Sequence, residues 1–495
     1  MKTYRAIVAA AFLAAAKTAG PQPPSKPPPR PVLSPSVKDF VLHDATVMAL
    51  THLTVIDGTG GNSRKDQTII LSGGRIEAVG DSDKVAIPQG AQVLGLAGRA
   101  ALPGLVGMHD HLFYFAKIAD MRHGQFEGPG ILVSEIAYSA PRLYLAAGVT
   151  TIRTTGSVEP YADLKVKAEI DQGKMPGPKV HATAPFLEGG PTEFAQLHEL
   201  RGPDDARRFV DYWAEQGFTS FKAYIHITRA DLSAAIQAAH KRKLKVTGHL
   251  CSIGFREAAA LGIDNLEHGF IVDTEFVPNK QPDVCPPGKA FSEAFDQLDP
   301  NGDEARKTID ELVRRKVAVT STLPVLELRV PGRPVLNAKA LNVLLPEARN
   351  NYFLRKALSN EQATPAAPAA FKKEMQLELA FARAGGLLLT GCDPTGMGGV
   401  IPGFADLRGV ELLSEAGFSP VEAIRIATLN GAQFLGESSS IGSIEKGKQA
   451  DLLIVKGDPS SNISDIENVE LVFKDGVAYD PSKLIDSVRG LVGLR

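Results

Sequence analysis

The chain has 495 residues, of which 44% are hydrophobic and 22% charged, and its formal net charge is -2. This composition is that of an ordinary soluble globular protein, with no excess of positive charge to bind nucleic acid or an anionic membrane. At this length we expect a large domain with a smaller companion.

The first residues have the layout of a secretory signal peptide. Lys2 and Arg5 precede an apolar run from Ala6 to Ala16, whose last alanines provide a small-residue cleavage site. The run is shorter than the roughly 20 residues that a membrane-spanning helix needs. We therefore expect a signal peptide at 1–20, export to the periplasm or the exterior, and no stable membrane anchor. A disordered alanine-rich tail is the alternative.

A proline-rich segment follows the signal peptide. From Pro21 to Pro35 the prolines are too dense for a helix or a sheet ladder, which predicts an extended linker over 21–40 and a fold that begins near residue 40.

The three cysteines predict no disulfide framework, because their number is odd. They also lack the spacing of a structural zinc site, so stability is expected to come from packing. They are Cys251, Cys285 and Cys392.

Short alternating strands with glycine-rich turns occur near both ends of the folded part. Leu53–Asp57, Thr68–Leu71 and Arg75–Val79 form the first group, and Ala450–Val455 and Val469–Phe473 form the second. We expect one small β-sandwich domain assembled from 41–98 and 437–495.

Between 99 and 436, apolar runs alternate with amphipathic helices, the pattern of a parallel sheet in an α/β fold. Eight such units predict a (β/α)₈ TIM barrel. Ser419 and Glu422 form a capping box, with Pro420 at the first helical position, for a helix leading out of the barrel. The expected strands begin at about Ala100, Val149, Lys179, Thr219, Lys245, Ile263, Val317 and Leu387.

Two long spans, 271–298 and 329–370, interrupt this alternation. Loops that follow barrel strands lie on the catalytic face, so these spans are expected to form substrate walls and a lid. Decoration or an oligomer contact is the alternative.

Two histidines separated by one residue, His109 and His111, end the first expected barrel strand. Side chains alternate along a strand, so both imidazoles face the same way. The pair is weak evidence alone, but it lies at the carboxyl end of a strand, where barrel enzymes keep their catalytic groups.

Lys222 ends the fourth expected strand in an otherwise apolar setting. If burial lowers its pKa, the neutral amine can add CO₂ and become a carbamate, an anion with two oxygens that can bridge two cations. The alternative is a lysine whose ammonium reaches out to water.

His249, His268 and Asp393 end the fifth, sixth and eighth strands in the same way. Each histidine alone could be a hydrogen-bonded core residue. Together with the three preceding residues, however, these groups would meet at one rim of the barrel.

The order HxH, Lys, His, His, Asp resembles the binuclear amidohydrolase superfamily, and the local sequences resemble its imidazolonepropionase-like and Xaa-Pro dipeptidase-like branch. The flanking segments that share the resemblance are Val55–Gly60, Leu102–His109, Gly148–Arg153 and Ile444–Leu452.

The resemblance implies two divalent metal ions. One would be held by His109, His111 and Asp393, the other by His249 and His268, with carboxylated Lys222 as the bridge. Zinc suits these imidazole and oxygen ligands best, although manganese, cobalt or nickel could also bind.

Two cations that share a water lower its pKa and polarise a carbonyl, so a bridging hydroxide can attack an amide. Asp393 is expected to take the proton and return it to the leaving nitrogen. The expected substrate contacts are less specific: Tyr224, His181 or His226 for the oxyanion, and Arg153 or Arg329 for a carboxylate.

The sequence therefore predicts a hydrolase of amide C–N bonds in N-acyl amino acids, dipeptides or related small molecules. Ring opening of a cyclic amide, or deamination, is the alternative on the same centre. A non-catalytic binding protein on the same fold is a third hypothesis. Barrels of this kind resemble proteins that often form homo-oligomers.

Overall fold

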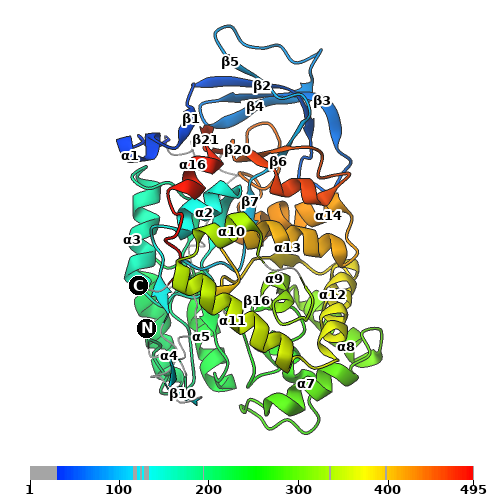
Figure 1. Cartoon of the computed structure of the whole chain (residues 1–495). Coiled ribbons are helices and arrows are strands. Elements are labelled where there is room, and N and C mark those ends of the chain that lie inside the picture. Colours follow the sequence, from blue (N-terminus) through cyan, green and yellow to red (C-terminus); the bar gives the residue numbers. More distant parts are fainter. Residues whose placement is uncertain are drawn as a thin grey trace, which may run out of the picture.

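The computed structural model describes residues 30–114, 120–122, 125–127, 133–192, 194, 196–333, 336–395 and 398–493. The expected signal peptide at 1–20 lies outside the described residues. Figure 1 shows a β-sheet stacked on one end of a larger α/β body.

Strands from both ends of the chain share one nine-stranded sheet, as the sequence predicts. Its order is β1-β21-β20-β19-β6-β2-β3-β4, with β5 paired to β2. Leu50, Leu71, Leu452 and Phe473 belong to one buried cluster of this sheet. The strands are β1 (Val41–His43), β2 (Val47–Val55), β3 (Arg64–Ser72), β4 (Arg75–Asp81), β5 (Gln92–Gly95), β6 (Arg99–Pro103), β19 (Leu452–Lys456), β20 (Val469–Lys474) and β21 (Val477–Tyr479).

Eight parallel strands form two further sheets, ordered β13-β12-β7 and β14-β15-β16-β17-β18. Strands β12 and β17 are buried at every position, as expected where helices cover both faces. The last seven begin within two residues of their predicted starts. The eight are β7 (Leu105–Gly107), β12 (Val149–Arg153), β13 (Lys179–His181), β14 (Ser220–Ala223), β15 (Lys245–Gly248), β16 (Asn265–Glu267), β17 (Ala318–Ser321) and β18 (Leu388–Thr390).

The two parallel sheets meet along both of their edges. On one side, isolated parallel bridges join Thr183 to Ser220 and Leu187 to Ala223. On the other, the backbone N–H of Met108 donates to the carbonyl of Thr390 at 2.9 Å. These contacts bring β13 next to β14, and the end of β7 next to β18.

The first predicted strand is divided in two, which corrects its expected start near Ala100. Residues 99–103 form β6, which pairs with β19 and β2 in the nine-stranded sheet, and β7 begins only at Leu105. Gly104 makes the crossing possible, because a Cβ there would collide with the side chain of Thr150.

Helices follow most of the parallel strands and cover their outer faces (Figure 1). The predicted capping box is present: the N–H of Ser419 donates to Glu422 Oε2 at 2.8 Å at the start of α14. The main helices are α2 (Ala140–Ala146), α3 (Pro160–Asp171), α4 (Pro203–Glu215), α5 (Arg229–Lys241), α6 (Phe255–Leu261), α8 (Asp303–Arg315), α12 (Ala367–Arg383), α13 (Phe404–Glu415) and α14 (Pro420–Arg425).

The two expected insertions carry their own helices. In 271–298 these are the single turn η1 (Thr274–Phe276) and α7 (Gly288–Gln297); the segment after β17 has α9 (Leu323–Glu327), α10 (Ala338–Val343) and α11 (Pro346–Gln362). Within the described residues, no helix combines the length and apolar character needed to span a membrane.

The folded part begins earlier than residue 40, inside the expected linker. A short helix, α1 (Pro35–Lys38), places Val37 in the main core at 1% exposure. The N–H of Ser34 donates to the carbonyl of Gly173 at 2.9 Å. Pro35 fits at the start of this helix because proline is tolerated in the first helical turn.

Candidate metal centre

His109 and His111 follow β7 and are 0% and 2% exposed. Nδ1 of His109 lies 2.7 Å from Glu267 Oε2, and Nδ1 of His111 lies 3.1 Å from the carbonyl of Gly156. These partners leave each Nε2 to face Asp393, at 3.7 Å and 3.4 Å from its Oδ1. Histidine ligands of metals are commonly oriented by such a bond on the other ring nitrogen.

Lys222, His249 and His268 approach the same point from three neighbouring strands. Nζ of Lys222 lies 3.1 Å from Nε2 of His109. The ring of His268 lies 4.2 Å from that of His249 and 4.5 Å from that of His109, measured between centroids. All six side chains that the sequence singled out as metal ligands therefore lie in one cluster, in which all are buried except His249, which is half-buried.

Two of these residues have a left-handed backbone conformation, which eight other non-glycine residues of the described chain share. His268 has φ +69° and Asp393 has φ +49°, although neither is glycine. The carbonyl of His109 holds Asp393 in place by accepting its N–H at 2.7 Å.

The protonation states of the cluster suit a metal. Burial lowers the pKa of His111 to about 4 and that of His249 to about 3, and it also lowers the pKa of His268. Burial raises the pKa of Asp393, but contacts with His109 and His111 outweigh it and hold that pKa well below its usual range. Neutral imidazoles and an ionised carboxylate are the forms that bind cations.

One nitrogen of the cluster, Nε2 of His268, is placed to bind a ligand. Nδ1 of His268 lies 2.9 Å from Thr322 Oγ1, while its buried Nε2 has no hydrogen-bond partner within the described residues. Ligand atoms of His109, His268 and Asp393 all lie within 4.8 Å of one another. A buried nitrogen without a partner is costly unless a ligand satisfies it, so the residues present fit a metal.

Burial also lowers the pKa of Lys222, to about 8. The side chain is 2% exposed, which rules out the alternative in which its ammonium reaches water. A neutral amine is therefore accessible near neutral pH, as carbamate formation requires.

Arg153 and Glu267 form a buried ion pair, and Glu267 in turn contacts His109 of the cluster. Arg153 Nη2 lies 2.7 Å from Glu267 Oε1, and its Nε donates to the carbonyl of Met108 at 2.8 Å. Arg153 is 1% exposed and is not among the cavity-lining residues, which corrects its expected role in binding a substrate carboxylate. Glu267 was not predicted from the sequence, although a carboxylate at the end of a buried strand and directly before His268 is a usable signal.

The cluster opens into a cavity of about 810 Å³. Tyr224 and Arg329 line it, as expected of substrate contacts. Both insertions also form its walls: Val272 and Phe291 come from 271–298, and Arg355, Leu358 and Ala363 come from 329–370.

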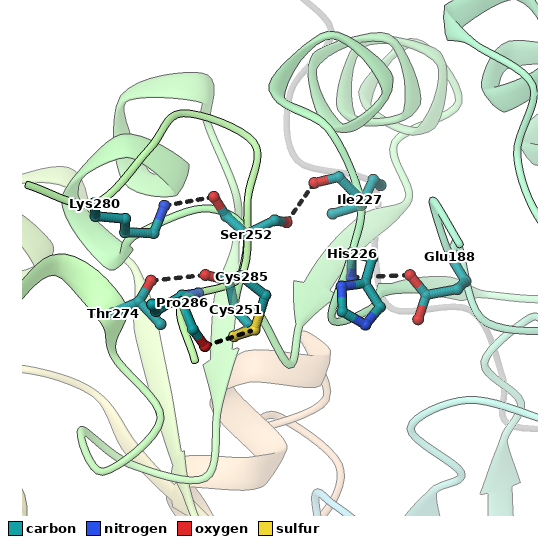
Figure 2. The surroundings of a disulfide bond; sticks show 9 residues. All are labelled: Glu188, His226, Ile227, Cys251, Ser252, Thr274, Lys280, Cys285 and Pro286. Carbon is teal, nitrogen blue, oxygen red and sulfur yellow. Dashed lines mark hydrogen bonds between the residues drawn. A yellow bond between two sulfur atoms is a disulfide. The ribbon is translucent and has the colours of Figure 1, made fainter. Parts of the chain in front are cut away.

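His181 and His226 are not among the cavity-lining residues, so neither is placed to support an oxyanion there. Nε2 of His181 lies 3.5 Å from Glu437 Oε1. The backbone N–H of His226 donates to Glu188 Oε1 at 2.9 Å (Figure 2). Their positions in the sequence, at the ends of predicted strands, did not show whether the side chains of His181 and His226 would line the cavity.

Cys251 and Cys285 form a disulfide, which corrects the expectation that packing alone stabilises the chain (Figure 2). The bond ties the insertion 271–298 to the segment just after His249. Thr274 Oγ1 adds a hydrogen bond of 2.8 Å to the carbonyl of Cys251. The odd count was misleading because Cys392 is buried and unpaired.

The fold and the donor cluster together indicate a metal-binding α/β enzyme. The Amidohydrolase family model matches residues 100–282 and 320–478, which is more than half of the chain. The chain therefore belongs to the amidohydrolase family, and it is a hydrolase that acts on carbon–nitrogen bonds. No curated protein matches the sequence.

Solved structures agree with this family. A candidate prolidase from Bifidobacterium longum is 26% identical, with a TM-score of 0.63 over 89% of this chain and 98% of that one. An Xaa-Pro dipeptidase with bound methionine is 19% identical, with a TM-score of 0.64 over 88% and 100%. A bottromycin amidohydrolase is 19% identical, with a TM-score of 0.64 over 90% and 91%.

Proposed function

We propose that this protein is a binuclear metal-dependent hydrolase that cleaves the amide bond of an N-acyl amino acid, a dipeptide or a related amide. One observation carries the proposal. Six side chains at the ends of five parallel strands, all able to bind or bridge cations, form one cluster, and all of them except His109 line one cavity. Prolidases and an Xaa-Pro dipeptidase among the similar structures favour a dipeptide-sized substrate.

The proposal includes a closed (β/α)₈ barrel with a β-sandwich beside it. Support for closure comes from the contacts that join the two parallel sheets at both edges. In such a barrel the catalytic groups lie at the carboxyl ends of the strands, which is where the six residues are found. We propose that the barrel spans 99–436 and that the sandwich is formed by 41–98 and 437–495. Strand β6, at the start of the barrel range, pairs within the sheet of the sandwich.

Zinc is the proposed ion at both positions. His109, His111 and Asp393 would hold one ion, and His249 and His268 the other, with carboxylated Lys222 between them. The bound ions would supply a water of lowered pKa and a polarised substrate carbonyl.

The chain's own residues handle the proton and the substrate. Asp393 stays ionised at neutral pH, so its carboxylate can accept a proton from the attacking water and pass it to the leaving nitrogen. Tyr224 lines the cavity next to His249, with ring centroids 5.3 Å apart. Its hydroxyl is proposed to support the negative charge that develops on the carbonyl oxygen.

Export is proposed for the whole chain. The Cys251–Cys285 disulfide supports it, because disulfides persist in oxidising compartments and are rare in the cytosol.

A parallel assay tests the proposed function. Protein purified with zinc and bicarbonate is offered dipeptides, N-acyl amino acids and cyclic amides, with a metal-free sample as the control. We expect zinc-dependent hydrolysis of the first two classes. Hydrolysis of cyclic amides alone would favour the ring-opening alternative, and a chain that binds no metal would contradict the proposal.

A further inference from the structure

The cavity has an uneven charge distribution. Among the described residues that line it, Asp393 is the one acid, and it belongs to the candidate metal centre. Two arginines, Arg329 and Arg355, line the wall formed by the segment after β17. Two metal ions on the floor would add further positive charge, so the cavity as a whole favours an anionic ligand.

Both arginines belong to one rigid part of this wall. Arg355 lies in the middle of α11, and Arg329 lies just after α9. The neighbouring Lys356 is 5% exposed, and its ammonium donates to the carbonyls of Leu328 and Val330 at 3.1 Å and 3.3 Å. Since these carbonyls flank Arg329, Lys356 fixes the Arg329 backbone to the helix that carries Arg355.

Glu327, a buried acid of the same segment, already has cationic partners. Glu327 is 6% exposed and lies 2.7 Å from Arg333 and 2.8 Å from Arg408. Within the described residues, the guanidinium of Arg329 has neither a hydrogen bond nor an ion pair. Arg355 Nε donates to Asn351 Oδ1 at 3.1 Å, and partial burial lowers the pKa of Arg355. A guanidinium at the cavity wall can bind a carboxylate through two parallel hydrogen bonds.

A different wall of the cavity is aromatic. The ring of Tyr224 lies 4.7 Å from Phe186 and 6.1 Å from Phe194, and Phe113 stacks on His111 at 4.2 Å, measured between centroids. Aromatic surfaces of this kind bind large apolar groups. The cavity therefore offers one region for an anion and another for a bulky apolar group.

We propose that Arg329 and Arg355 bind a free carboxylate of the substrate, while the aromatic wall formed by Phe186, Phe194 and Tyr224 takes a bulky apolar group. This inference rests on the proposed amide hydrolysis and narrows its substrate to amides with one carboxylate and one large apolar or aromatic part. Arg355 is the residue that the sequence analysis did not single out.

Kinetics with matched substrates test the inference. Each N-acyl amino acid or dipeptide is paired with its C-terminal carboxamide, which keeps the shape but removes the charge. For Arg355→Gln and Arg329→Gln we expect KM to rise about 10- to 100-fold on the carboxylates. On the carboxamides KM should stay within about twofold, and kcat should change little, because neither arginine is a proposed metal ligand.

Two control variants separate recognition from general damage. Arg349→Gln removes a charge from an exposed position of the same helix and should change neither KM. Arg355→Lys keeps the charge without the bidentate fork and should lie between the wild type and Arg355→Gln. An equal rise of KM on carboxylates and carboxamides in Arg355→Gln would overturn the inference.

Binding measured by calorimetry keeps the inference separate from the proposed function. The probe is N-benzoyl-L-phenylalanine against its carboxamide, titrated into zinc-loaded wild type and Arg329→Gln/Arg355→Gln. We expect the wild type to prefer the carboxylate about 10-fold or more, and the double variant to lose the preference. A preference that persists in the double variant would contradict the inference, even if the protein hydrolyses amides. If the double variant lost the preference for the carboxylate but the wild type hydrolysed no amide, the inference would hold and the proposed function would be wrong.

Discussion

The amine of Lys222, in β14, lies 3.1 Å from Nε2 of His109, which follows β7 and is 113 positions away in the chain. Since Nδ1 of His109 faces the Glu267 carboxylate, Nε2 is the nitrogen that can accept a hydrogen bond from this amine. Burial lowers the pKa of both. With Lys222 converted to a carbamate, both residues would be able to hold metal ions in place of this hydrogen bond.

Reconstitution of the metal-free protein should depend on bicarbonate and on pH. The Lys222 amine has a pKa of about 8, so it is mostly protonated at pH 6.5 and mostly neutral at pH 9. Because only the neutral amine adds CO₂, zinc-dependent activity should return faster at pH 9. The measurement is the rate of recovery with and without added bicarbonate. If activity returned at the same rate with and without bicarbonate at both pH values, the carbamate would be contradicted.

Lys222→Ala should lose most of its activity and bind its two metals less tightly. Short carboxylic acids, which can occupy the space of the lost side chain, should restore part of the activity. Lys245→Ala is a matched control. Lys245 is also a partly buried lysine of a neighbouring strand, β15, but its amine donates to the carbonyl of Phe434. Equal losses in the two variants would indicate general destabilisation.

Asp393→Asn should lower kcat by about 10²- to 10⁴-fold, the usual contribution of a general acid–base group. The amide cannot accept the proton, but it keeps the size of the side chain and one oxygen. Zinc content measured by elemental analysis should stay at half of the wild-type value or more. Turnover at the wild-type rate would show that another group moves the proton.

Glu267→Gln should weaken metal binding, although Glu267 is not itself a proposed metal ligand. The substitution removes the charge that orients His109 and leaves the buried guanidinium of Arg153 without its ion pair. We expect zinc affinity to fall about 10- to 100-fold and the free energy of unfolding to fall by about 3–5 kcal/mol. The double variant Glu267→Gln/Arg153→Met removes the unpaired charge and should recover part of the stability but not the zinc affinity.

Removing the disulfide should destabilise the chain while leaving the metal centre intact. Cys251→Ser/Cys285→Ser should lower the free energy of unfolding by about 2–4 kcal/mol, because the bond closes a long loop. Zinc content should be unchanged, and KM should rise as Val272 and Phe291 lose their fixed position in the cavity wall. Unchanged thermal unfolding in the double variant would contradict this role.

The sequence predicted the parallel strands and all six members of the cluster, because both follow from local patterns. Apolar runs mark buried strands, and a histidine, lysine or aspartate at the end of such a run stands out from them. Val149 and Lys245, for example, begin β12 and β15 as expected.

The remaining features depend on contacts between distant segments, which a single sequence does not display. Whether Arg153 faces the cavity or Glu267 depends on the packing of β12 against the strands around it. The pairing of Cys251 with Cys285 depends on how the insertion folds back, and the split at Gly104 depends on the close approach of Thr150.

Anomalous diffraction from crystals of the zinc-loaded protein, with elemental analysis of the same sample, tests the central claim most directly. We predict two zinc ions per chain, one contacted by His109, His111 and Asp393, the other by His249 and His268, with extra density on Lys222 between them. A single ion, or ions bound away from these side chains, would contradict the account.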